Sequence, residues 1–409
     1  MKILHSSDWH LGNRMMERSR IDEFERFLSW MMVQIEQEKP DALLISGDIF
    51  DVSSPGETVR ELFSDFLSRV DETGCHQVIL TAGNHDGVAQ LNSIKPLLKR
   101  YHVHLVATLS VESANDCLIP LFDNRGAEIG LVCAVPYLRP MDVSVAVPEE
   151  DNEGSDLSYI RGIEAVYKRV AELASEWKEK HPDLPVIAMG HLSVSGVETT
   201  SSTRRLIGTL DVVNASIFSR VFDYVALGHI HKPSSMDQGR IQYCGSPLAM
   251  GIDETDYTHQ IICWENGSVT QIPVPEMTLF RRFDLKSDEE SPIIINEIKA
   301  LYQKFQVPVW VLIEYVAATV NHMSSVRDQL NAINSDILQY RLVAKREQMN
   351  GESRASFSPE DRLTQYTPEL LFERRLEEYE KNMGTPIEKQ KREKIVDLFK
   401  QIVSEISAD

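Results

Sequence analysis

The stretch KILHSSDWHLG, residues 2–12, decides the fold class of this chain. Residues 2–6 contain a short apolar run of the kind that forms a strand buried in a sheet, and polar residues end it. Asp8 and His10 follow, two positions apart. A buried strand that ends on such residues is typical of an α/β sheet with a ligand site at its carboxyl edge.

Five further apolar runs have the same character, at residues 42–46, 78–82, 129–136, 186–190 and 224–228. Between them lie segments whose apolar residues recur with helical spacing, at 21–35, 59–70 and 163–177. Because buried strands alternate with amphipathic helices, the sequence predicts a layered α/β architecture.

The chain divides into four predicted segments. Residues 1–275 form the α/β domain, which short runs at 241–244, 260–264 and 269–273 are expected to close as a β-meander. Residues 276–345 alternate strand and helix and predict a small α+β domain. Residues 346–366 predict a polar linker, and two amphipathic helices follow at 367–409. Those helices either pack on their own domain or dock on a partner, and the sequence favours neither.

The composition is that of a soluble globular protein. The 409 residues are 42 % hydrophobic and 25 % charged, and no apolar run is long enough to span a membrane. Neither a signal peptide nor a CxxC pair is present, so we expect a cytoplasmic chain without disulfides or a thiolate zinc site. The net charge of −20 argues against nucleic-acid binding by the whole surface, but not by one face or one metal cluster.

Five short motifs stand where predicted strands end. They are Asp8-Trp9-His10, Gly47-Asp48-Ile49-Phe50-Asp51, Gly83-Asn84-His85-Asp86, Gly190-His191 and Gly228-His229-Ile230-His231. Their oxygen and imidazole groups suit Mn²⁺, Fe²⁺ or Zn²⁺. Asp8 and His10 are spaced to turn toward one ion. The His229 and His231 pair repeats that spacing, and Asp48 is placed to bridge two ions. The glycines permit close approach of the backbone.

In this order the motifs resemble the calcineurin-like metallophosphoesterase superfamily, over residues 8–231. Each motif is weak alone, but all five at strand ends are specific together. The resemblance implies a four-layer α/β sandwich. The opening stretch, with residues 81–86, 136–140, 226–231 and 243–247, also resembles the narrower family of bacterial SbcD-type nuclease subunits. That similarity extends over nearly the whole chain and implies a capping domain at 276–345 and C-terminal helices.

The resemblance implies two Mn²⁺ ions and a role for each motif residue. The first ion is held by Asp8, His10, Asp48 and His231, and the second by Asp48, Asn84, His191 and His229. His85 protonates the leaving oxygen, and Asp86 orients His85. Such a metal pair lowers the pKa of a water molecule and stabilises in-line displacement at a phosphodiester. Asp51 departs from the family, because some relatives carry a second histidine there.

The implied function is that of a manganese-dependent DNA nuclease, exonuclease on duplex ends and endonuclease on single strands or hairpins. The implied partners are an SbcC-type coiled-coil ATPase, which the C-terminal helices would bind, and a second copy in a homodimer. One alternative is a phosphoesterase of small substrates, although such a substrate needs neither the extra domain nor the helices. The other is a non-catalytic DNA-end scaffold, which the complete ligand set disfavours.

Three features remain open from the sequence. Asp51 is either a hydrogen-bond acceptor behind the metal ligands or a turn residue. Arg139 either faces a phosphate or is a solvated loop residue. The loop at 193–208, with Arg204 and Arg205, is long for a plain connection and is a candidate DNA contact. Seven further histidines are expected to be structural or exposed: His5, His76, His102, His104, His181, His259 and His322.

Overall fold

The computed structural model describes residues 1–75, 77–143, 155–197, 212–285, 290–316, 320–333 and 338–345, together with residues 392 and 399. The chain forms two units, residues 1–346 and 347–409. The predicted linker at 346–366 and helices at 367–409 lie outside the described residues, apart from residues 392 and 399. Every predicted site residue belongs to the first unit.

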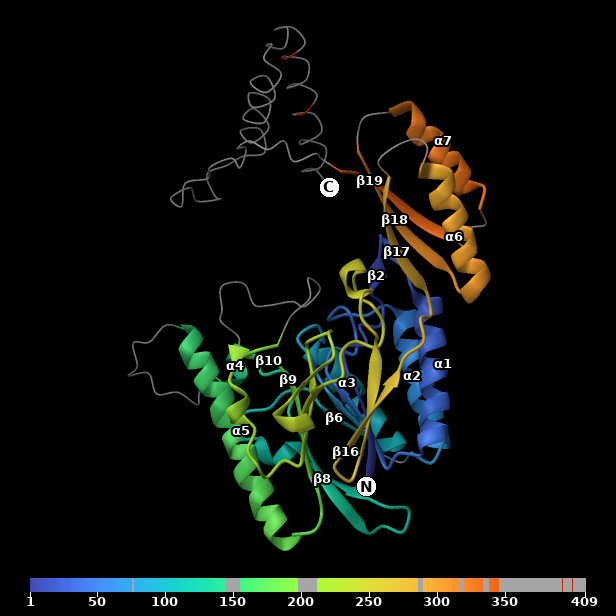
Figure 1. Ribbon diagram of the computed structural model, residues 1–409. Coiled ribbons are helices and arrows are strands. Elements are labelled where there is room, and N and C mark those ends of the chain that lie inside the picture. Colours follow the sequence, from blue (N-terminus) through green and yellow to red (C-terminus); the bar gives the residue numbers. More distant parts are fainter. Residues whose placement is uncertain are drawn as a thin grey trace. The chain divides into compact units, whose positions relative to one another are not determined.

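Two six-stranded sheets form the centre of the first unit (Figure 1). The first sheet has the order β16 (Ser268–Pro273), β15 (Gln260–Glu265), β1 (Lys2–Ser6), β4 (Ala42–Ser46), β5 (Val78–Thr81), β6 (Val103–Val106). The second has the order β13 (Ser234–Met236), β14 (Ile241–Tyr243), β12 (Tyr224–Gly228), β9 (Val186–His191), β8 (Glu128–Ala134), β7 (Leu118–Phe122). The strands that precede the motifs pair in parallel with each other within each sheet.

The predicted meander is wrong. β14 pairs in parallel with β12 in the second sheet, whereas β15 and β16 form an antiparallel hairpin on the edge of the first sheet next to β1. The residues between β14 and β15, 244–259, are numerous enough to carry the chain from one sheet to the other. Closely spaced strands therefore do not have to pair with each other.

Helices cover the outer faces of both sheets. α1 (Ile21–Glu38), α2 (Glu57–Glu72) and α3 (Val88–Leu98) share a hydrophobic core with the first sheet, and α5 (Ser155–Lys180) shares one with the second. Neighbouring strand residues serve opposite faces: Ile3 enters the core between the sheets, and Leu4 enters the core under α1 and α2. The four-layer α/β sandwich is confirmed. None of the helices in the described ranges is both long and apolar enough to cross a membrane.

A smaller α+β region follows the sandwich. β17 (Leu279–Leu285), β18 (Val309–Val316) and β19 (Leu338–Lys345) form a parallel sheet with its own core against α6 (Ser291–Phe305) and α7 (Val320–Asn331). All five elements were predicted, and the boundary at residue 275 stays a prediction. Phe280 and Trp310 pack with Met15 of the short hairpin β2 (Arg14–Met15) and β3 (Arg18–Ser19).

Candidate metal centre

The predicted metal ligands converge from the carboxyl ends of five central strands. β1 leads to Asp8 and His10, β4 to Asp48, β5 to Asn84, β9 to His191, and β12 to His229 and His231. The two sheets meet here, because the backbone N–H of His229 donates to Asp8 Oδ1 at 2.8 Å. Asn84 is partly buried, and each of the other six residues is at most 6 % exposed.

Four of these residues have left-handed backbone conformations, namely Asp8 (φ 53°), His10 (φ 45°), Asp48 (φ 49°) and His229 (φ 90°). Such conformations cost about 1–3 kcal/mol each for a residue other than glycine and concentrate at functional sites. Backbone hydrogen bonds hold two of them: Asp8 N–H donates to Gly47 O at 3.1 Å, and His10 N–H donates to Asp48 O at 3.0 Å. The ends of β1 and β4 are thus tied together with their side chains turned toward the centre.

The first half-site consists of Asp8, His10 and His231, whose ligand atoms lie within 4.8 Å of one another. Nε2 of His10 and Nε2 of His231 are 3.2 Å apart. The other ring nitrogen of His231, Nδ1, lies 2.8 Å from Oε1 of the buried Glu254. Because a carboxylate accepts there, Nδ1 carries the hydrogen and Nε2 presents its lone pair toward His10. Two imidazole nitrogens facing each other beside a carboxylate fit a metal cation.

The second half-site consists of Asn84, His191 and His229. Nδ1 of His191 donates to the carbonyl oxygen of Ser46 at 2.9 Å. Its Nε2 lies 3.0 Å from Asn84 Oδ1, which is also 3.1 Å from Nδ1 of His229. The lone pair of a neutral His191 would therefore face an oxygen, and either a second proton or a metal cation resolves that conflict.

Asp48 lies between the half-sites. Its Oδ2 is 3.6 Å from Nε2 of His10 and 3.2 Å from Nε2 of His191. Gly83 lets this carboxylate fit, because a Cβ on residue 83 would stand 2.1 Å from Asp48 Oδ1. The arrangement suits a bridging carboxylate. The spacing of His229 and His231 suggested a shared ion, but the structure directs His229 to Asn84 and His231 to His10.

The pKa shifts in this cluster reflect close packing of opposite charges. Burial alone would raise the pKa of Asp48, but His191 and then His10 outweigh it and hold that pKa well below its usual range. Burial would likewise lower the pKa of His191, but Asp48 outweighs it and raises that pKa to about 9. For His229 burial prevails, next aided by His191, and its pKa falls to about 3. The site thus combines a firmly ionised carboxylate with histidines, as a metal centre requires.

His85, the predicted proton donor, lies beside the first half-site. Its ring centroid is 4.6 Å from that of His10, and its backbone N–H donates to Asp48 Oδ1 at 2.8 Å. Nδ1 of His85 donates to the carbonyl oxygen of Asp51 at 2.8 Å. This bond leaves Nε2 as the ring atom that can exchange a proton with a substrate.

Asp86 supports the backbone around His85. Its carboxylate accepts hydrogen bonds from the backbone N–H groups of Gly83, Ile49 and Phe50, at 2.9, 3.1 and 3.0 Å. Burial, and next the Asp48 charge, raise the pKa of Asp86 to about 6. The structure therefore places Asp86 behind the two turns that carry Asp48 and His85, so orientation of His85 by Asp86 would act through the backbone.

The structure also bears on the features that the sequence left open. The Asp51 carboxylate lies 3.4 Å from Nδ1 of His10, as expected for an acceptor behind a ligand. Arg139 donates from Nη2 to the carbonyl oxygen of Asp86 at 3.0 Å, so it supports the turn that carries His85. Of the candidate DNA loop, residues 193–197 are described, with β10 (Ser193–Val194) paired to β11 (Val212–Val213). Residues 198–208 of this loop lie outside the described residues.

Sequence reasoning missed Glu254, which lies 23 residues after its partner His231 in no recognisable motif. The segment 243–247, which carries part of the family resemblance, offered an indirect signal. Its Ser246 N–H donates to the carbonyl oxygen of His231 at 3.1 Å. The segment therefore packs directly against a predicted metal ligand.

Comparison with known proteins gives the same family. The model of the calcineurin-like phosphoesterase family matches residues 1–233. The chain is 30 % identical over 386 residues to the D subunit of nuclease SbcCD from Escherichia coli (strain K12), covering 92 % of each chain. Identity to the protein of the same name from Rhodobacter capsulatus is 31 % over 390 residues, covering 91 % of this chain and 93 % of that one. The Bacillus subtilis protein is 29 % identical over 264 residues, covering 64 % and 65 %.

The family model covers more than half of the chain, and the full-length relatives exceed the identity at which a shared family is secure. The described site agrees, since its carboxylates, amide and imidazoles form a cluster able to hold metal ions. The chain therefore belongs to the calcineurin-like phosphoesterase family of metal-dependent hydrolases.

Proposed function

We propose that this chain is the manganese-dependent nuclease subunit of a DNA end-processing complex, an exonuclease on duplex ends and an endonuclease on single strands and hairpins. Relatives named as nuclease subunits, which align with more than nine tenths of the chain, support the nuclease assignment. The observation that carries the chemistry is the pair of half-sites around Asp48, with His85 beside them.

The proposed ligands fit a pair of divalent cations. Asp8, His10, Asp48 and His231 would hold the first, and Asp48, Asn84, His191 and His229 the second. Oxygen and imidazole donors without thiolate suit Mn²⁺. When bound, the two ions supply the Lewis acidity that activates the phosphodiester and the attacking water. The opposed nitrogens of His10 and His231, and the lone pair of His191 that faces Asn84, support this assignment.

The residues of the chain itself would position and protonate the substrate. His85 donates its Nδ1 hydrogen to the Asp51 carbonyl, so its Nε2 can deliver a proton to the departing oxygen. Asp86 holds the Ile49–Phe50 and Gly83 backbone in place, which keeps Asp48 and His85 at a constant separation. Burial of the ligands excludes bulk water and strengthens these electrostatic interactions.

We further propose a homodimer that acts in the cytoplasm with an SbcC-type coiled-coil ATPase, in DNA repair. The printed names of the relatives describe one subunit of a two-component nuclease, which supports such a partner. The predicted helices at 367–409 would bind it, because their apolar stripes suit a helix-on-helix contact.

The test is cleavage of an end-labelled hairpin duplex with Mn²⁺, Mg²⁺ or EDTA, by the wild type and by His85→Gln, each alone and with an SbcC-type ATPase. We expect cleavage with Mn²⁺ that EDTA abolishes and that His85→Gln reduces by about 10²–10⁴-fold while Mn²⁺ remains bound. Intact DNA together with hydrolysis of a small phosphoester would favour the small-substrate alternative. Binding to DNA ends without any hydrolysis would favour the scaffold.

A further inference from the structure

Glu254 is a buried carboxylate that no sequence motif marks and that points at a predicted metal ligand. It ends the short 3-10 helix η6 (Ile252–Glu254) and is fully buried. Its Oε1 lies 2.8 Å from Nδ1 of His231, and its Oε2 accepts the backbone N–H of Met250 at 2.8 Å. Burying a carboxylate is costly unless it is paired, so the contact with His231 is a specific feature of this site.

We propose that Glu254 is a positioning residue that sets the metal affinity of the first half-site through His231. The proposal rests on the metal site assigned above and concerns which ion binds more tightly. A carboxylate on Nδ1–H fixes the tautomer and the ring orientation of a ligating histidine, and makes its other nitrogen a stronger donor. His231 receives this support from a charged group, whereas His191 in the second half-site is backed by the neutral Ser46 carbonyl.

The loop that carries Glu254 is built as a brace for His231. Ser246 N–H donates to the His231 carbonyl at 3.1 Å. The ring of His259 spans the loop, with Nδ1 2.7 Å from the Ser246 carbonyl and Nε2 3.1 Å from the Glu254 carbonyl. The carboxylate is therefore held by its own loop at both its oxygen and its backbone.

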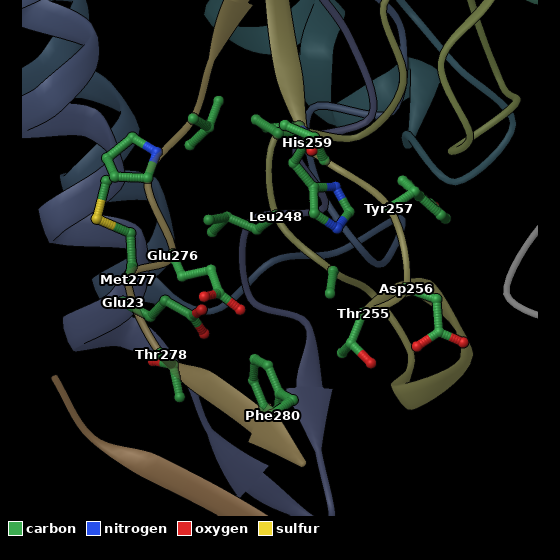
Figure 2. Close-up of a pocket in the computed structure, with 15 residues that line it drawn as sticks. Glu23, Leu248, Thr255, Asp256, Tyr257, His259, Glu276, Met277, Thr278 and Phe280 are labelled. Atoms are coloured by element: carbon green, nitrogen blue, oxygen red, sulfur yellow. The ribbon is translucent and has the colours of Figure 1, made fainter. Parts of the chain in front are cut away.

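A cavity borders this loop immediately after Glu254. It has a volume of about 370 Å³ and is lined in part by residues 255–259. Figure 2 shows His259 and Leu248 in its wall. Because the wall is not solidly packed on this side, the hydrogen bonds of Glu254 and His259 must hold the loop against His231. Asp256 lies in the same wall and is exposed, which makes it a matched control for a change of charge in this loop.

The experiment titrates Mn²⁺ into the metal-free full-length chain and follows unbound Mn²⁺ by electron paramagnetic resonance. Wild type, Glu254→Gln, Glu254→Asp and Asp256→Asn are compared, with thermal melting of each metal-free protein. We expect two ions in the wild type. Glu254→Gln should weaken one ion by about 10–100-fold and leave the other within about twofold. Glu254→Asp, which keeps the charge, should lie between them, and Asp256→Asn should match the wild type.

Three results would overturn the proposal, and they differ from a failure of the proposed function. The first two are a Glu254→Gln variant that binds both ions as the wild type does, and one that weakens both equally. The third is a Glu254→Asp variant as weak as Glu254→Gln although it melts at the wild-type temperature. A wild type that binds no Mn²⁺ would instead refute the metal site itself. His231→Gln should abolish the affected class, and adding Glu254→Gln to it should cause no further loss.

Discussion

The two half-sites share Asp48 but differ in what stands behind their histidines. In the first, carboxylates face the outer ring nitrogens: Glu254 lies 2.8 Å from His231, and Asp51 lies 3.4 Å from His10. In the second, the outer nitrogen of His191 donates to a neutral backbone carbonyl at 2.9 Å. Similar ligand types are therefore given different electrostatic support by the loops around them.

This difference predicts an order of metal binding. Because carboxylate-backed imidazoles are the stronger donors, we expect the first half-site to fill at lower Mn²⁺ concentration. The second half-site includes the partly buried Asn84, an uncharged ligand, which lowers its electrostatic attraction for a cation. Ligand type alone does not reveal this asymmetry, since it depends on groups one contact further out.

Asp48→Asn should have the largest effect, because it removes the charge shared by both half-sites. We expect Mn²⁺ binding to weaken at both ions and DNA cleavage to fall by at least about 10³-fold. Titration of Mn²⁺ and a hairpin-cleavage assay check this. Loss of one ion alone would show that Asp48 belongs to a single half-site.

Removing one histidine at a time should separate the half-sites. His231→Gln should eliminate the tighter Mn²⁺ class, and His229→Gln should eliminate the weaker class, each reducing the stoichiometry from two ions to one. Isothermal titration calorimetry of the metal-free proteins distinguishes the two cases. If both variants lose the same class, the assignment of these two histidines to different ions is wrong.

Asp51→Asn should have a smaller effect on the tighter ion. The Asp51 carboxylate is farther from its histidine than Glu254 is, and its side chain is 26 % exposed, so solvent weakens its influence. We expect a loss of affinity of about threefold, below that of Glu254→Gln. The same calorimetric titration measures it, and a loss equal to that of Glu254→Gln would contradict the ranking by distance and burial.

His5→Gln should leave both ions unaffected and change only stability. His5 is fully buried in β1, and burial lowers its pKa to about 3. Since the unfolded-state pKa is about 6.5, stability from the neutral ring is complete above pH 6.5 and is lost as the pH falls toward 3. The free energy of unfolding should drop by about 1.4 kcal/mol per pH unit below 6.5 in the wild type.

Urea denaturation between pH 7.5 and 5 measures that slope, which should be shallower in His5→Gln. An unchanged slope would mean that other groups cause the acid sensitivity. A change in Mn²⁺ affinity would mean that His5 acts on the half-sites after all.

Local signals predicted the central strands and the ligands, because hydrophobic runs and strand-end motifs are properties of adjacent residues. β1, β4 and β12 have the bounds that the sequence predicts. Sheet membership was not predictable in the same way, since β14 and β15 are neighbours in the chain but lie in different sheets. Pairing depends on contacts with strands far away in sequence.

The supporting groups were beyond sequence reasoning for a similar reason. Glu254 reaches His231 across 23 residues, and Arg139 reaches the Asp86 carbonyl across 53. Asp86 binds backbone N–H groups, whose positions follow from turn geometry and not from any side-chain pattern. The part that metal chemistry requires is thus legible in the motifs, whereas the part that orients it depends on the three-dimensional fold.

The most direct test is anomalous diffraction from crystals of the full-length chain grown with Mn²⁺. We predict two peaks on either side of the Asp48 carboxylate, one next to His10 and His231 and the other next to His191 and His229. At limiting Mn²⁺ the peak next to His231 should have the higher occupancy. A single peak, or higher occupancy beside His191, would contradict the proposed pair of unequal half-sites.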